Sequence, residues 1–188
     1  MALPHAILVS LCEHAGSGYE LTRRFDRSMG YFWSTTHQQM YRTLRAMEDD
    51  GWVQVAAVTQ QGRPDKKVYS VTDAGREELA RWITEPFSAS GRSGSAVTDT
   101  RTRDLAVKLR GASFGDVHAV AEQTVTLRAE RAAQLQTYQD YEKRQFPDPS
   151  TLTGAALHQY LVLRGGVRAE QNSIEWLDEV LAALGVTP

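Results

Sequence analysis

The chain of 188 residues has a single cysteine, Cys12, so it has no internal disulfide and no zinc site built from a cysteine cluster. Cys12 stands in an apolar segment, where a buried small side chain is favoured over a reactive thiol. The five histidines lack the spacing of metal ligands: they are His5, His14, His37, His118 and His158. No metal and no cofactor are expected.

Long apolar runs and catalytic motifs are missing as well. No run of about 18 apolar residues exists, so no transmembrane helix is expected. The apolar start, MALPHAILVSLCEHAG, has no basic segment and no clear cleavage site, and we interpret it as a first core helix of a cytoplasmic protein rather than a signal peptide. There is no nucleophile elbow and no phosphate-binding glycine loop; Gly165 and Gly166 lie inside a helical pattern that favours a kink or a close helix crossing. An enzyme is not predicted.

An excess of positive charge is also absent. The formal net charge is −2, with ten Lys/Arg against eleven Asp/Glu in residues 1–87 and eleven against twelve in residues 88–188. Overall charge therefore does not favour a nucleic-acid partner, and any DNA binding must depend on a local cluster of basic residues.

One stretch of the chain is rich in glycine and serine. SASGRSGS, from Ser88 to Ser95, follows Pro86 directly, and this composition is typical of a flexible connection. We therefore predict a first domain over residues 1–87, a linker over 88–96 and a second domain over 97–188.

Helical periodicity dominates the start of the first domain. It predicts helices from about Leu3 to His14 and from about Tyr19 to Met29, followed by a third within STTHQQMYRTLRAMEDDGWV, which starts at Ser34. Thr35 and Gln38 have capping-box spacing at its start, with Ser34 as an alternative cap. Gly51 is well placed to end it.

The pattern then changes to period two. WVQVAAVT and KKVYSVT read as strands, and QQGRPD between them favours a turn, which together predict a hairpin. Thr72 or Asp73 would cap a fourth helix, whose apolar face holds Leu79, Trp82 and Ile83. Three helices, a two-stranded hairpin and a linking helix describe a winged helix–turn–helix in a mainly α protein.

The second half is helical throughout. Helices are predicted from about Val97 to Arg110, Phe114 to Tyr141 and Gly154 to Leu184, with breaks at GASFGD and FPDPS. Long amphipathic helices are marginal alone, so a second copy of the chain is favoured as their partner over an intrachain bundle. The predicted dimer-interface residues of this dimerisation domain are Leu157, Leu161, Ile174, Trp176, Leu177, Leu181 and Leu184.

The third helix offers a candidate DNA-reading face. Met40, Leu44 and Met47 form its apolar stripe, whereas the opposite face carries long polar side chains. Arg and Gln can contact guanine and adenine in the major groove through paired hydrogen bonds, although a merely solvated face is the simpler alternative. The predicted DNA-binding residues of this helix are Thr36, His37, Gln38, Gln39, Tyr41, Arg42 and Arg45. His37 is ambiguous, and Gln38 has capping as an alternative role.

Further candidates lie outside the third helix. Arg63, Lys66 and Lys67 fall at the predicted hairpin tip, where they would contact phosphates or serve as ordinary strand-edge charges. Tyr19, near the start of the second helix, could reach the DNA backbone or pack against the hairpin.

Three motifs occur in a familiar order. GYEL at Gly18–Leu21, QQMYRTLRAMEDDGWV at Gln38–Val53 and GRPDKKVYSVTDAGREEL at Gly62–Leu79 resemble the PadR family of transcriptional regulators. The second half, from DLAVKL to WLDEVLAAL, is similar to the virulence-activator type of helical C-terminal domain. The resemblance implies a homodimeric regulator, usually a repressor, and some members respond to small aromatic acids or drugs. Asp65 departs from a basic wing, because a carboxylate there would repel phosphate.

These observations predict a dimeric, sequence-specific DNA-binding regulator. Each third helix would enter one major groove of a palindromic operator, with half-sites about one helical turn (~34–36 Å) apart. The rival hypothesis is a winged-helix protein-interaction module that binds no DNA. Several aromatic residues could line an effector pocket, although core or dimer contacts are favoured for them: Trp33, Trp82, Tyr138, Tyr141, Tyr160 and Trp176.

Overall fold

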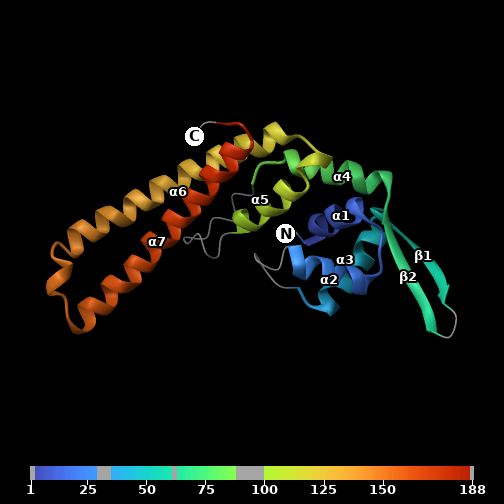
Figure 1. Ribbon diagram of the computed structural model, residues 1–188, viewed down its shortest axis with the longest axis horizontal. Coiled ribbons are helices and arrows are strands. Elements are labelled where there is room, and N and C mark those ends of the chain that lie inside the picture. Colours follow the sequence, from blue (N-terminus) through green and yellow to red (C-terminus); the bar gives the residue numbers. More distant parts are fainter. Residues whose placement is uncertain (1–2, 29–34, 61–62, 88–99, 187–188) are drawn as a thin grey trace. The chain divides into compact units, whose positions relative to one another are not determined.

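The computed structural model describes residues 3–28, 35–60, 63–87 and 100–186, and within these ranges nothing is stated about the side chains of residues 28, 59, 60 and 63–65. The chain divides into two compact units, one of Met1–Phe87 with Arg101–Val120 and the other of Ser88–Thr100 with Ala121–Pro188. The first unit contains helices α1 to α5 and one two-stranded sheet, and the second contains most of α6 and all of α7 (Figure 1). The mainly helical fold and the winged helix–turn–helix are confirmed.

Helix α1 (Leu3–Glu13) is the centre of the first unit. Every side chain from His5 to Leu11 is buried, as expected for a helix that is apolar all round. The helix contacts α2 (Gly18–Ser28), α3 (His37–Asp49), α4 (Asp73–Thr84) and strand β2 (Arg63–Val71). Cys12 is only partly buried, yet burial raises the pKa of its thiol, which disfavours the reactive thiolate.

The N-cap of α3 is one residue later in the sequence than predicted. Thr36 and Gln39 form the capping box, whereas Thr35 and Gln38 were predicted, and Ser34 lies outside the described residues. Both pairs have the same spacing, so the choice depends on the extended backbone at Thr36. The predicted end is confirmed: Gly51 has a φ of +75°, which favours glycine, and its N–H donates to the Glu48 carbonyl.

Strands β1 (Val53–Gln60) and β2 (Arg63–Val71) form the predicted antiparallel hairpin. Both run further toward the tip than the sequence suggested, since the predicted turn began at Gln60 and ended at Asp65. Thr72 caps α4 by accepting a hydrogen bond from Gly75, and an added Cβ at Gly75 would lie 2.2 Å from the Trp52 carbonyl oxygen. The base of the hairpin and the start of α4 are therefore packed backbone to backbone.

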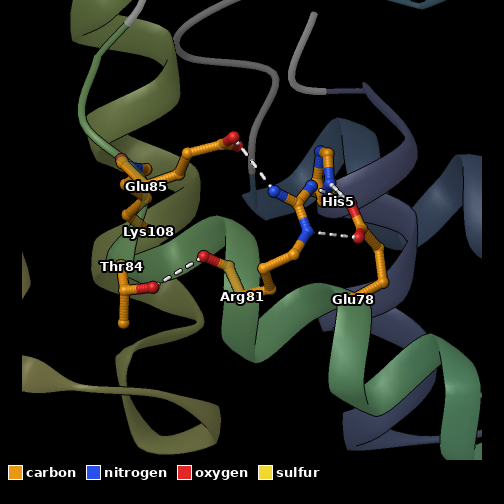
Figure 2. Close-up of polar contacts among 6 residues, drawn as sticks. All are labelled: His5, Glu78, Arg81, Thr84, Glu85 and Lys108. Atoms are coloured by element: carbon orange, nitrogen blue, oxygen red, sulfur yellow. Dashed lines mark hydrogen bonds and ion pairs between the residues drawn. The ribbon is translucent and has the colours of Figure 1, made fainter.

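Helix α5 (Thr100–Arg110) belongs to the first compact unit, although residues 97–188 were predicted as one separate domain. The reason is an apolar face, with Leu105 and Val107 buried, and a fully buried lysine. Lys108 donates to the carbonyl of Glu85 at the end of α4, and both residues are drawn in Figure 2. The Nζ of Lys108 also lies 5.0 Å from the ring centroids of Trp82 and of Phe87. The division into compact units thus places residues 101–120 with the first unit, whereas the predicted second domain began at residue 97.

An ionic network lies beside this lysine. Arg81 pairs with Glu78 at 2.8 Å and with Glu85 at 2.9 Å, and Glu78 also meets the ring of His5 at 2.9 Å (Figure 2). The His5 ring stacks on Trp82 with 4.2 Å between centroids. Helices α1 and α4 are therefore joined by polar as well as apolar contacts.

The second unit is a helical hairpin in which α6 (Val117–Gln145) and α7 (Gly154–Ala183) lie side by side (Figure 1). Ion pairs join them, among them Arg128–Asp178 at 2.7 Å, Arg131–Glu170 at 3.4 Å and Arg164–Glu142 at 3.1 Å. An added Cβ at Gly166 would lie 3.3 Å from the Tyr138 ring, which agrees with the predicted close helix crossing. The predicted breaks are also present, as the short 3₁₀ helices η3 (Ala112–Phe114) and η4 (Pro149–Thr151).

This packing corrects two predicted dimer contacts. Leu177 and Leu181 are both 0% exposed within a single chain, so they have no surface left for a second copy. At these positions the intrachain alternative is what the structure shows. Leu157, Ile174, Trp176 and Leu184 are partly buried, and Leu161 is exposed.

Lys108 gives a test of the α4–α5 contact. Burial lowers the pKa of its ammonium to about 8. Between pH 8 and the ordinary lysine value of about 10.4, the unfolded chain holds a proton that the folded chain lacks, so the free energy of unfolding rises with pH in this window. Between pH 7.5 and pH 10.5, we expect the free energy of unfolding measured in urea to rise by roughly 1–3 kcal/mol more for wild type than for Lys108→Met.

The control for this experiment is Lys143→Met, because Lys143 is exposed on α6. Its pH profile should run parallel to that of wild type. If the pH profile of Lys108→Met also runs parallel to that of wild type, Lys108 does not release a proton in this pH window and is not buried as described.

Candidate nucleic-acid interface

The outward face of α3 is open to solvent. Met40, Leu44 and Met47 are at most 1% exposed and hold the helix against the core, which confirms the predicted apolar stripe. The predicted reading residues on the other side are all exposed: His37, Gln38, Gln39, Tyr41, Arg42 and Arg45.

Two of the predicted contact residues also cap the helix. The Thr36 N–H donates to Oε1 of Gln39 at 3.1 Å, and the Gln39 N–H donates to Oγ1 of Thr36 at 3.2 Å. These side chains fix the first turn of α3. Gln38, for which capping was the alternative role, is instead exposed beside them.

The start of α2 lies against the start of α3. The rings of Tyr19 and His37 stack with 6.3 Å between centroids, so Tyr19 is placed beside α3 and is 56% exposed. An added Cβ at Gly18 would lie 2.4 Å from the Tyr41 ring. The absence of a side chain at Gly18 therefore lets the two helices approach at this point.

A cleft of about 890 Å³ opens between α2, α3 and β2. Five basic side chains and three tyrosines line it: Arg23, Arg24, Arg27, Lys66, Lys67, Tyr19, Tyr41 and Tyr69. Arg23 and Arg27 were not predicted. A signal existed, because Tyr19, Arg23 and Arg27 follow one another at steps of four and share one face of α2. The local basic cluster that DNA binding requires is thus present within residues 1–87, although this segment has no basic excess.

Arg24 has a structural role within this cleft. Its guanidinium donates to the carbonyls of Ser10 at 3.0 Å, His14 at 2.6 Å and Ala15 at 3.4 Å. It therefore satisfies carbonyl groups at the C-terminal end of α1, where positive charge is also favourable to the helix dipole.

The hairpin residues differ from one another. Lys66 pairs with Glu20 of α2 at 2.7 Å, and this pairing is the main cause that lowers the pKa of Glu20 to about 2. Lys67 is exposed. The side chains of Arg63 and Asp65 lie outside the described residues, so their predicted effects on phosphate are untested.

The candidate effector residues are found in different surroundings. Trp82 is part of the core of the first unit, and Tyr160 of α7 meets Phe146 edge to face at 5.5 Å. Tyr141 is exposed, with the Arg144 guanidinium 5.4 Å from its ring centroid. Trp33 lies outside the described residues.

The described residues offer no metal site and no membrane-spanning helix. Across residues 3–28, 35–60, 63–87 and 100–186, no group of three or more His, Cys, Asp or Glu residues could hold a metal ion. Within those same ranges, the helices are too short or too polar to span a bilayer.

Comparisons with known proteins identify the family. Residues 7–81 match the transcriptional regulator PadR-like family, and residues 103–185 match the virulence activator alpha C-terminal domain. The chain is 68% identical to the probable transcriptional regulator Rv1176c of Mycobacterium tuberculosis over 98% of both chains, and 28% identical to the negative transcriptional regulator PadR of Bacillus subtilis over 97% of both. The crystal structure of the Bacillus subtilis protein with operator DNA is similar at 25% identity and a TM-score of 0.44, over 97% of each chain. The chain belongs to the PadR-like family of transcriptional regulators, a family without enzymatic activity, as its sequence motifs suggested.

Proposed function

We propose that this protein is a dimeric repressor that binds a palindromic operator with α3 in the major groove. The observation that carries the proposal is the exposed polar face of α3 beside a basic cleft. A winged-helix module for protein binding would not need this combination of guanidinium, amide and lysine side chains. Loss of DNA affinity as salt rises would separate the two hypotheses.

The side chains divide into two roles. Gln38, Arg42 and Arg45 lie at steps of four and three on α3, so they share one face and would read base edges. The positively charged side chains beside them would position the protein on phosphates without carrying sequence information: they are Arg23, Arg27 and Lys67.

Repression and effector response rest on the family rather than on geometry. The Bacillus subtilis relative is named a negative regulator, which supports repression as the outcome of binding. A response to a small aromatic effector remains a prediction. Such a ligand would act by favouring a conformation in which the two DNA-binding units no longer fit two half-sites.

The proposed dimer would use the exposed apolar residues of α7. Leu161 is 56% exposed and Val162 is 79% exposed, and they are neighbours on this helix. Contiguous exposed apolar surface is a feature of protein–protein contact sites. Leu161 therefore becomes the main candidate among the predicted interface residues.

The reading face is tested by Arg42→Ala and Arg45→Ala. A pair of hydrogen bonds from one side chain to one base contributes about 1–3 kcal/mol of discrimination. Each variant should therefore bind DNA from upstream of the protein's own gene roughly 5–150-fold more weakly than wild type does. Fluorescence anisotropy with a labelled duplex measures the change. Arg76→Ala is the matched control, because Arg76 is exposed on α4 outside the cleft. Unchanged affinity in both α3 variants would contradict the proposed reading face.

The dimer is tested by Leu161→Glu. A buried, unpaired carboxylate is costly, so the variant should sediment as a monomer at micromolar concentrations where wild type is a dimer. Val58→Glu serves as the control, since Val58 is an exposed apolar residue of β1. A wild-type chain that sediments as a stable monomer would exclude the model with two half-sites.

A further inference from the structure

One acidic residue lies inside the basic cleft. Glu20 of α2 is among the lining residues, and its Oε1 accepts a hydrogen bond from Nζ of Lys66 at 2.7 Å. The partners are 46 residues apart in the chain. A carboxylate where phosphate is expected to approach needs an explanation.

The carboxylate of Glu20 is held in place by the start of its own helix. Its Oε2 accepts hydrogen bonds from the Ser17 N–H at 2.8 Å and from the Ser17 hydroxyl at 3.0 Å, while the Ser17 hydroxyl oxygen accepts from the Glu20 N–H at 3.4 Å. This reciprocal arrangement is a capping box. Glu20 therefore holds its position without help from Lys66.

The backbone also fixes the distance between the two partners. Gly16 and Tyr69 exchange hydrogen bonds, from the Gly16 N–H to the Tyr69 carbonyl at 3.0 Å and from the Tyr69 N–H to the Gly16 carbonyl at 2.9 Å. This bridge ties the segment before α2 to strand β2, three residues beyond Lys66. The meeting of Glu20 and Lys66 is thus built into the scaffold.

Opening the Glu20–Lys66 ion pair on DNA would add little to the affinity for DNA. A partly exposed ion pair contributes only about 0–1 kcal/mol to stability, so stability is not its main consequence. If Lys66 turned to a phosphate, however, the capped carboxylate would stay in the cleft and repel the same DNA backbone. The two charges are therefore expected to cancel, whereas the exposed Lys67 next in sequence keeps its full charge.

We propose that Glu20 sets the charge of the wing: it keeps Lys66 paired with α2, so that Lys67 and not Lys66 neutralises phosphate. This inference rests on the proposed DNA-binding function and adds a positioning residue to it. Its consequence is lower affinity for DNA of any sequence, because sequence-independent binding depends on the number of phosphates neutralised. A larger share of the binding energy then depends on the bases read by α3.

The test compares salt dependence in full-length variants. Affinity for a scrambled duplex and for DNA from upstream of the gene is measured by anisotropy over a range of KCl concentrations, for wild type, Glu20→Gln, Lys66→Gln, Lys67→Gln and the double variant Glu20→Gln/Lys66→Gln. The slope of log affinity against log salt changes by about 0.9 for each phosphate neutralised. The glutamine at position 20 still accepts the capping hydrogen bonds, so α2 should remain folded.

The expected results differ between the variants. Glu20→Gln steepens the slope by about 0.9, which is an additional loss of about 3.5-fold between about 50 and about 200 mM salt. Lys66→Gln also flattens the slope, because it leaves the capped carboxylate of Glu20 unpaired in the cleft. Lys67→Gln reduces the slope by about 0.9, and the double variant returns to the wild-type slope. Glu20→Gln raises the affinity for both duplexes by a similar factor, because phosphate contacts carry no sequence information.

The contradicting results are distinct. If the double variant reduces the slope as much as Lys67→Gln does, or if Glu20→Gln leaves it unchanged, the pair opens on DNA and the inference fails while the proposed function stands. If wild type binds neither duplex at any salt concentration, the proposed function itself fails, and the inference with it.

Discussion

The rotation of α3 about its own axis is the constraint on which the rest of the account depends. Burial of Met40, Leu44 and Met47 fixes this rotation, and each such side chain contributes about 1.5–3 kcal/mol when fully buried. Because helical side chains repeat every 3.6 residues, fixing one stripe also fixes the opposite one. Arg42 and Arg45 are exposed for this reason, and a protein that lost the stripe would lose the reading face as well.

Charge in this protein is arranged locally rather than in bulk. Residues 1–87 have one more acidic than basic side chain, yet α2 and β2 bring five basic side chains to one cleft. Not all of these charges are available to a partner, since Arg24 serves the end of α1 and Lys66 meets Glu20. What remains is a small set that can position a duplex while leaving discrimination to α3.

The limits of the sequence follow from the range of each interaction. Local periodicity correctly predicted the helices, the hairpin and the stripe of α3, because these depend on neighbours within a few residues. The cap of α3 was misplaced by one residue, since two Thr–Gln pairs have equal spacing. Contacts between distant segments are not encoded in any local pattern. Such contacts produce the pairing of Lys66 with Glu20, the burial of Lys108 against α4 and the burial of Leu177. The basic face of α2 was visible as a repeat of four but was missed.

The central claim is that α3 lies in the major groove at two sites related by a dimer axis. Guanine N7 faces the major groove, so dimethyl sulfate protection on DNA upstream of the gene tests the claim directly. We expect two clusters of protected guanines about one helical turn apart. Binding of the same DNA that leaves every guanine N7 reactive would contradict it.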